Sequence, residues 1–419
     1  MKKLFTTIAV IGLISGITFI YAYNHHLYVW QQPKQSIWIF NGHLFDAVSS
    51  QPSENKGILI TDGKISCIGD TCKAPKDAIR IDAAGKTIVP GLIELHGHFF
   101  GGKAEQGKQS VPAMMWDSVR FKPAVRRKLI GAGITSYRSV GDPVSAIVKL
   151  KEQLNSQQIA GPRMFIAGPI FTARGGHPTQ GQIPGWMIDQ MTVQSDDPIY
   201  VKQQILALAK QGVDGIKVVY QGMINKQGVI TMPRISKETL LAITTEARKH
   251  GLWVAVHTGS PEEHIEAIEA GITTIEHGVR HGDLVGQETL ELILTNNVIY
   301  VPTLGREPKG HLNIPSLHQA GVKFGVGTDT QAEMIVGDSY HDELSRMVDA
   351  GLPDVDALLA ATRHGAMALG KLNELGTIET GKNADLLIVD GQPWIDIRDL
   401  RKINYVVLSG RIALAQAAN

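Results

Sequence analysis

Metal-binding side chains recur along this chain in a fixed order, each at or just after the end of a short strand-like segment. They are His96-Gly97-His98, Lys217, His257, His277 and Asp329, and helix-like stretches lie between them. Side chains at the ends of successive strands converge on one point if the strands close into a barrel. That point can hold a transition-metal ion or a pair of them.

The middle of the chain predicts an α/β fold. Eight strand segments alternate with helical stretches such as 200–211 and 236–250. The expected strands are 87–95, 133–140, 163–170, 215–219, 253–257, 273–277, 298–302 and 323–328. Eight strand–helix units predict a (β/α)8 TIM barrel, here over residues 89–372, with its chemistry at the carboxyl ends of the strands.

The two ends of the barrel region are flanked by β-rich sequence. Residues 36–88 and 373–415 contain short apolar strands separated by turns such as Asp62-Gly63 and Ser409-Gly410. Two such pieces at opposite ends of a chain most simply pair with each other. We therefore expect one small composite β-sandwich domain built from both ends.

Residues 1–30 predict a signal anchor or a signal peptide. Lys2 and Lys3 precede residues 4–22, which carry no charge. This stretch approaches the roughly 20 residues that span a bilayer, whereas a cleaved h-region has about 7–15. The length favours an uncleaved transmembrane anchor with a cytoplasmic N-terminus. The protein is then exported and anchored in a periplasm-like space, or secreted if the segment is cleaved.

Composition bears on nucleic-acid binding and on whether the protein is exported. The chain has 41 Lys+Arg and 40 Asp+Glu, so nucleic-acid binding has no electrostatic support. Cys67 and Cys72 are the only cysteines. They can form a disulfide, which would agree with export, or remain two thiols, because close spacing does not fix the geometry. A homo-oligomer is left open.

Lys217 is the most discriminating of the metal-seeking residues. It lies in the apolar run 215–219, a strand that should be buried on both faces, where a bare ammonium is unfavourable. One solution is pairing with a carboxylate such as Asp214 or Asp329. The other is addition of carbon dioxide to the amine, which gives an anionic carbamate able to bridge two cations. The imidazoles expected on neighbouring strands favour the carbamate.

The other ligands follow from strand geometry. Residues two apart share a face of a strand, so His96 and His98 can bind one ion, while Glu94 lies one step deeper and more simply orients a ligand. His257 and His277 end consecutive strands, which favours metal binding over a structural role. Asp329 at the last strand can bind an ion and accept a proton from water.

Two motifs identify the chain as similar to the amidohydrolase superfamily, in the branch of imidazolonepropionase-like proteins and metal-dependent prolidases. Residues 85–98 read GKTIVPGLIELHGH and resemble the first-strand signature. Residues 375–386 read LGTIETGKNADL and resemble the return to the small β-domain. The resemblance runs from about Ser36 to Ile412 and leaves out the N-terminal segment.

The resemblance implies a centre of two divalent metal ions, usually zinc. His96, His98 and Asp329 would hold the first ion and His257 and His277 the second, with carboxylated Lys217 as the bridge. The two ions would activate a bridging water, and Asp329 would carry its proton to the leaving nitrogen. Tyr220 is either a residue that polarises the substrate carbonyl or a packing residue.

Two departures from the superfamily pattern concern the pocket. Glu94 stands where relatives usually have Asp, and the stretch between Val301 and Lys323 is shorter than usual, which leaves a more open site or a gap filled by another loop. Candidate substrate-binding residues follow several strands at the catalytic face. They are Arg174, His177, Arg280, His281 and Arg306, and any of these arginines could bind a substrate carboxylate through two nitrogens.

These observations predict a metal-dependent hydrolase of carbon–nitrogen bonds, with an Xaa-Pro-type dipeptide as the favoured small-molecule substrate. The first alternative is a mononuclear enzyme of the same fold that opens a cyclic amide or deaminates a ring. The second is a catalytically silent scaffold presented at the membrane. The apparent need for a bridging Lys217 argues against the first, and the complete ligand set argues against the second.

Overall fold

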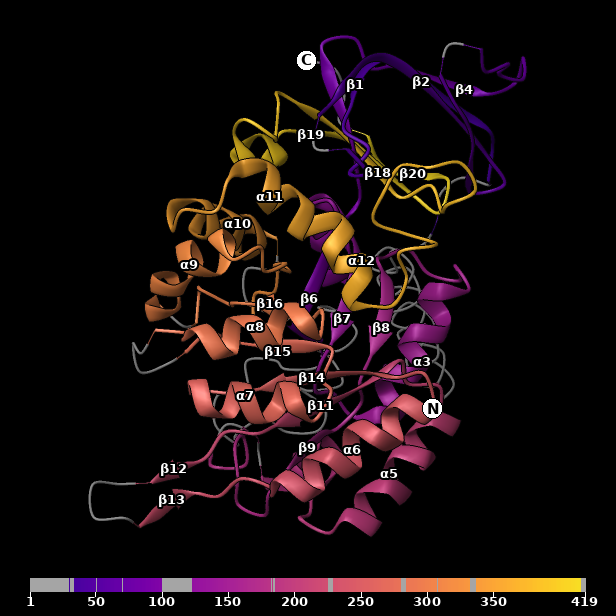
Figure 1. The fold of residues 1–419 in the computed structure, drawn as a ribbon. Helices are drawn as coiled ribbons and strands as arrows, with labels where there is room; N and C mark the ends of the chain where they lie inside the picture. Colours follow the sequence, from indigo (N-terminus) through magenta and orange to yellow (C-terminus); the bar gives the residue numbers. More distant parts are fainter. Residues whose placement is uncertain are drawn as a thin grey trace, which may run out of the picture.

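Parallel strands form the centre of the protein, and helices surround them (Figure 1). The fold is taken from a computed structural model. It describes residues 30, 34–49, 51–69, 71–99, 123–181, 183, 185–224, 229–279, 284–306, 308–331 and 337–415. Arg280 and His281, two of the predicted substrate-binding residues, lie outside these ranges, as does nearly all of the predicted N-terminal anchor.

The central strands are connected side by side in a ring. In order they are β6 (Leu92–His98), β7 (Ile134–Ser139), β8 (Arg163–Ile166), β11 (Gly215–Val219), β14 (Trp253–His257), β15 (Thr274–Glu276) and β16 (Ile299–Val301). Asp214 N–H donates to Ile166 O and joins the β8 and β11 region, while β9 (Ile170–Thr172) also pairs with β11. Residues 323–328 close the ring by a bridge from Phe324 to β16 and a bond from Leu95 N to Val326 O.

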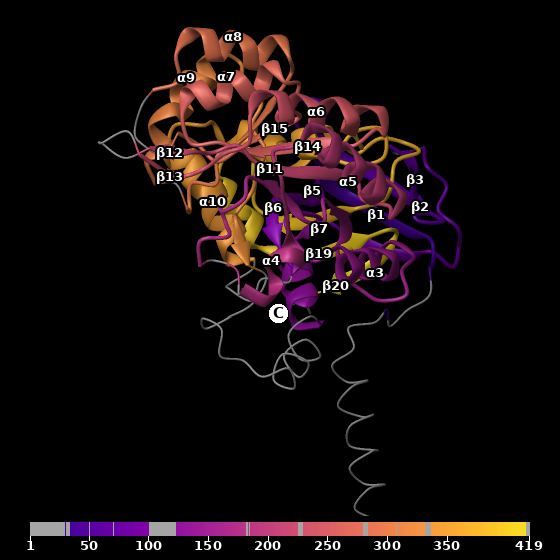
Figure 2. The same ribbon diagram turned by 90° about the horizontal axis from the view of Figure 1, so that it is seen from below.

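This arrangement is the α/β fold predicted from the alternating sequence, with parallel sheets consistent with a TIM barrel. Figure 2 shows the same arrangement from below, with helices outside the strands. Helices that lie wholly within the described residues include, in chain order, α3 (Val144–Asn155), α4 (Ile188–Met191), α5 (Pro198–Lys210), α6 (Lys237–Lys249), α7 (Pro261–Glu269), α8 (Gln287–Thr295), α9 (Ile314–Gln319), α10 (Asp338–Asp349), α11 (Asp354–Leu359) and α12 (Gly365–Ala368).

The predicted helices begin where side chains can cap them. The Asp197 carboxylate accepts from Ile199 N and Tyr200 N at the start of α5, and the Ser236 hydroxyl accepts from Thr239 N at the start of α6. Both helices turn apolar residues towards the barrel.

One predicted strand is wrong in its extent. Residues 87–95 do not form a single strand but divide at Gly91 into β5 (Lys86–Pro90) and β6, which belong to different sheets. A Cβ at Gly91 would lie 2.1 Å from Thr135 Oγ1, so the close approach of the backbone there requires glycine. The short apolar run alone does not show this change of sheet.

The two ends of the chain pair in one small β-domain. Strand β18 (Leu386–Asp390) runs antiparallel to β5, and the sheet continues through β19 (Ile403–Leu408) and β20 (Arg411–Ala415) on one side. The other members are β1 (Ile37–Leu44), β2 (Ser53–Thr61), β3 (Lys64–Ile68) and β4 (Ile79–Asp82). Instead of the two separate sheets of the predicted sandwich, these strands form one eight-stranded sheet. Residues from both ends of the chain bury a common apolar cluster.

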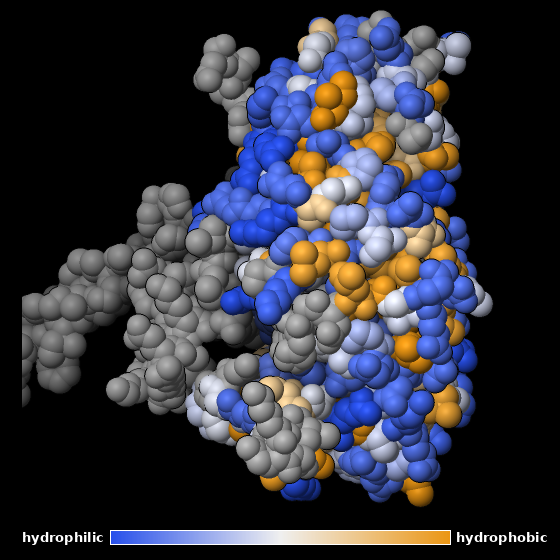
Figure 3. Space-filling model, turned by 60° about the vertical axis from the view of Figure 1, so that its left-hand side comes forward, coloured by the Kyte–Doolittle hydropathy of each residue, from blue (hydrophilic) through white to orange (hydrophobic). Residues whose placement is uncertain are grey.

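The β-domain also contains the cysteine pair, and the structure joins Cys67 and Cys72 in a disulfide. No helix in the described part of the chain is long and apolar enough to cross a membrane. On the face drawn in Figure 3, hydrophobic side chains lie scattered among hydrophilic ones.

Candidate metal centre

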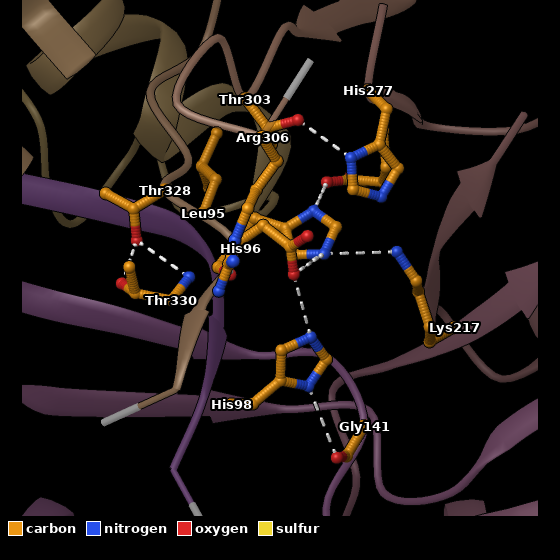
Figure 4. Close-up of polar contacts among 12 residues, drawn as sticks. Leu95, His96, His98, Gly141, Lys217, His277, Thr303, Arg306, Thr328 and Thr330 are labelled. Atoms are coloured by element: carbon orange, nitrogen blue, oxygen red, sulfur yellow. Dashed lines mark hydrogen bonds and ion pairs between the residues drawn. The ribbon is translucent and has the colours of Figure 1, made fainter. Parts of the chain in front are cut away.

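The predicted ligands come together at the carboxyl ends of the barrel strands. Asp329 Oδ1 lies 3.2 Å from His98 Nε2 and 3.5 Å from His96 Nε2. Lys217 Nζ, on β11, lies 3.4 Å from the same nitrogen of His96 (Figure 4). Nitrogen and carboxylate donors gathered around one point suit Zn²⁺ and similar ions.

His257 and His277 complete the cluster from β14 and the end of β15. Their ring centroids are 4.2 Å apart, and the His277 ring is 4.8 Å from that of His96. One donor atom each from His96, His277 and Asp329 lies within 4.8 Å of the others. These three residues come from both predicted ligand sets, His96 and Asp329 from the first ion and His277 from the second.

Hydrogen bonds orient the imidazoles. His96 Nδ1 lies 2.6 Å from Glu276 Oε2, and His277 Nδ1 lies 2.7 Å from Thr303 Oγ1, so each would bind a metal through Nε2. His257 differs, because its Nε2 lies 2.8 Å from Gln221 Oε1 and Nδ1 is its other donor. A bond from the outer nitrogen fixes the tautomer and the ring orientation of a ligand.

Glu276 and Arg138 are partners of the centre that the sequence did not reveal. Arg138 is fully buried; its Nη2 lies 2.5 Å from Glu276 Oε1 and its Nη1 lies 3.1 Å from Thr274 Oγ1. Burial alone would raise the pKa of Glu276, but the charges of Arg138 and His96 outweigh it and lower that pKa below its usual range. Glu276 is therefore an ionised carboxylate that faces the outer nitrogen of His96.

Glu94 acts one step deeper, as its position in the strand predicted. Its Oε1 accepts from His96 N at 2.7 Å and from Thr328 N at 3.1 Å. The carboxyl group therefore joins the first strand to the segment that precedes Asp329. Burial raises the pKa of Glu94 to about 8, although both backbone bonds oppose that rise.

The surroundings of His96 and Asp329 shift their pKa values so that one group is neutral and the other ionised. Burial and the nearby Lys217 lower the pKa of His96 to about 4, which favours the neutral imidazole that a metal requires. Burial would raise the pKa of Asp329, but the hydrogen bond from His98 and the neighbouring imidazoles hold it well below its usual range. The site therefore contains a neutral nitrogen donor beside a carboxylate.

Three non-glycine residues of the centre have left-handed backbone geometry. The φ angles are 73° at His277, 47° at Thr303 and 51° at Asp329. Such conformations are uncommon outside glycine and persist where surrounding contacts enforce them. They occur here at the ends of strands, where the backbone turns the ligands and their partner into the site.

The contacts of Lys217 bear on the two explanations for its burial. Its side chain is 2% exposed, and Asp214, one of the carboxylates considered as a partner, instead forms an ion pair with Lys151 at 2.8 Å. The amine points to His96 and the ligand cluster (Figure 4). This placement fits a bridging carbamate, and it leaves Asp329, whose Oδ1 lies 3.5 Å from the same His96 nitrogen, as the alternative partner.

The remaining candidates separate into different environments. The Tyr220 hydroxyl donates to Glu266 Oε2 at 2.8 Å, and this bond supports the packing role over carbonyl polarisation. The His177 ring lies 4.9 Å from that of His257, so the structure brings it to the centre. Arg174 is exposed on the loop before His177.

Comparisons with known proteins agree with this geometry. The model of the amidohydrolase family matches residues 87–413. A solved structure of a Xaa-Pro dipeptidase with methionine bound in its active site has 29% sequence identity and a TM-score of 0.76, covering 90% of this chain and 99% of that one. An imidazolonepropionase from Geobacillus sp. is 22% identical over 86% of this chain and 90% of its own length. A dihydroorotase from Syntrophotalea carbinolica is 25% identical over 84% and 89%, respectively.

The resemblance predicted from the first-strand and closing motifs is thus confirmed over most of the chain. The relatives named above are hydrolases, and their family depends on metal ions, as the ligand cluster at the strand ends also indicates. The chain belongs to the amidohydrolase family and is a metal-dependent hydrolase that acts on carbon–nitrogen bonds.

Proposed function

We propose that the enzyme is a binuclear dipeptidase of the Xaa-Pro type with two zinc ions bridged by carboxylated Lys217. The observation that carries the proposal is the burial of the Lys217 amine 3.4 Å from His96 Nε2 within a cluster of four histidines and Asp329. A carbamate on this amine would replace a buried positive charge with an anion suited to two cations. Imidazole and carboxylate donors fit zinc.

His96, His98 and Asp329 would hold one ion, His257 and His277 the other. When bound, the ions lower the pKa of water and polarise the substrate carbonyl. Asp329 is placed to take the proton from the attacking water, because its low pKa keeps it ionised and its side chain is 23% exposed. It would then give that proton to the leaving nitrogen, which departs as an amine.

The substrate class rests on the similarity to the solved Xaa-Pro dipeptidase structure, which has 29% sequence identity and covers 90% of this chain. The similarity to an imidazolonepropionase and a dihydroorotase keeps a cyclic amide as the second candidate. A cyclic-amide enzyme with one metal ion would have no need of a bridging group on Lys217.

Metal content tests the proposal directly. Protein purified with zinc and bicarbonate should contain close to two ions per chain, and Lys217→Ala should lower that ratio and abolish hydrolysis of Xaa-Pro dipeptides. Lys151→Ala, which removes a half-buried lysine paired with Asp214, is the matched control and should keep both ions. A ratio of one that does not change in Lys217→Ala would contradict the bridged centre and redirect the substrate screen to cyclic amides.

We further propose that residues 1–30 anchor the enzyme in a membrane with its catalytic body exported. The uncharged stretch 4–22 after Lys2 and Lys3 supports this, and a disulfide between Cys67 and Cys72 suits an oxidising compartment. Fractionation of cells that express the full chain tests it. Recovery of the enzyme from the cytoplasm with its N-terminus intact would contradict it.

A further inference from the structure

Arg306 lies beside the metal centre, in the loop that follows β16. Its Nε donates to the backbone carbonyl of Asp329 at 3.1 Å. In the view of Figure 4, its guanidinium lies on the side of His96 opposite Lys217. Among the described residues Arg306 is exposed and forms no ion pair. Because Nε is already used, the fork formed by the two Nη groups is the part that can bind an anion.

The exposure of the ligands shows from which side a substrate can approach. The side chains of Asp329 and His98 are 23% and 19% exposed, whereas that of His96 is 1% exposed. The open side of the centre is therefore the side of Asp329 and His98. Arg306 contacts Asp329 and so borders this opening.

The loop that carries Arg306 is held at successive residues. Thr303 contacts the ligand His277 at 2.7 Å, and the Glu343 carboxylate accepts from the backbone N–H groups of residues 304–305 at 2.5 and 2.8 Å. Glu343 is 1% exposed on α10, so this clamp is buried. A side chain whose backbone is fixed in advance loses less entropy when it binds a ligand.

The connection between β16 and residue 323 is short, and Arg306 is exposed on it. Beyond Arg306 the described chain contains only a 3-10 turn (Pro308–Asn313) and the short helix α9 before residues 323–328. The departure from the superfamily pattern predicts either an open site or a gap filled by another loop at this point. At Arg306, the structure has an exposed guanidinium.

We propose that Arg306 binds a carboxylate of the substrate, so that the enzyme selects carbon–nitrogen bonds whose leaving amine carries a free carboxylate. The inference rests on the proposed hydrolysis at this centre and adds its specificity-determining residue. A planar fork matches a carboxylate with two parallel hydrogen bonds, and a neutral carboxamide cannot form the same charged pair.

A matched pair of substrates tests this assignment: the dipeptide Ala-Pro and its C-terminal amide. The zinc-loaded wild-type enzyme should favour the free carboxylate by roughly 10- to 100-fold in kcat/KM, the range expected for hydrogen bonds between charged groups. Arg306→Met should remove most of this preference through a higher KM for Ala-Pro, with little change for the amide. Arg306→Lys should restore part of the preference, because the charge returns without the fork.

Lys309→Met is the control, since it removes an exposed cation from the same connection, and its substrate preference should match the wild type. Equal wild-type activity on both substrates would overturn the assignment and leave the proposed hydrolysis intact. An equal loss on both substrates in Arg306→Met would instead show that Arg306 only positions Asp329. No wild-type activity on either substrate would overturn the dipeptidase proposal and this inference together.

Discussion

Replacing Glu276 with Gln removes a charge from the most buried part of the centre while keeping the size of the side chain. The fully buried Arg138 would lose the carboxylate at 2.5 Å, and His96 Nδ1 would lose its anionic partner at 2.6 Å. Breaking a buried pair in this way costs about 3–5 kcal/mol of folding stability, because one charge is left without compensation. Loss of the carboxylate behind a metal-binding histidine should also weaken metal affinity by roughly 10- to 100-fold.

Two measurements separate these effects. Urea unfolding of the metal-free protein measures the loss of folding stability when Arg138 has no carboxylate partner. Competition with a chelator measures the affinity for zinc. Arg138→Met/Glu276→Gln should be less destabilised than the sum of the single variants, because the double change removes both charges. If Glu276→Gln unfolds at the wild-type urea concentration and binds zinc with wild-type affinity, the assigned role of the pair is wrong.

Other changes test separate parts of the argument. Asp329→Asn should lower kcat by roughly 100- to 10,000-fold with an unchanged circular dichroism spectrum; full activity would exclude Asp329 as the proton carrier. Burial lowers the pKa of His264 to about 4, whereas in the unfolded protein this histidine takes up a proton near pH 6.5. The contribution of neutral His264 to the free energy of unfolding should therefore be fully present above pH 6.5 and fall by roughly 3 kcal/mol towards pH 4. Urea unfolding of His264→Leu should lack this share of the pH dependence. Gly327→Ala would place a Cβ 2.7 Å from that of His96 and should lower stability by about 1–3 kcal/mol, whereas Gly131→Ala meets no atom within 4 Å and should not lower thermal stability.

The ligand cluster could be predicted from the sequence because the carboxyl ends of all the strands in a barrel lie close together. Residues that follow successive strands in the chain therefore meet in space. His96, Lys217 and His277 are far apart in the chain, yet each lies near the carboxyl end of a parallel strand. Strand periodicity and residue chemistry are enough to place such residues. The same reasoning placed Glu94 beneath His96, where its carboxylate accepts backbone hydrogen bonds.

The partners of the ligands were harder to predict, since their contacts depend on which strands are neighbours across the barrel. Arg138 and Glu276 lie in expected strands. Nothing in their local sequence shows that these two residues, separated by 138 positions in the chain, form an ion pair. A charged residue inside an expected barrel strand, as also at Lys217, was a signal that could have been followed. Tyr220 was ambiguous for the same reason, because Glu266 lies in the helix after the next strand.

Buried carboxyl groups explain how the strained ends of the strands are kept in place. Glu94 holds the backbone at residues 96 and 328, Glu276 contacts the ring of His96, and Glu343 holds residues 304–305. Each is almost fully buried, where an acid is retained only if hydrogen bonds or cations compensate its desolvation. Well-packed apolar residues could fill the same space, so stability alone does not account for three acids around one point. A metal centre does account for them, because catalysis needs ligands fixed in orientation before the substrate arrives.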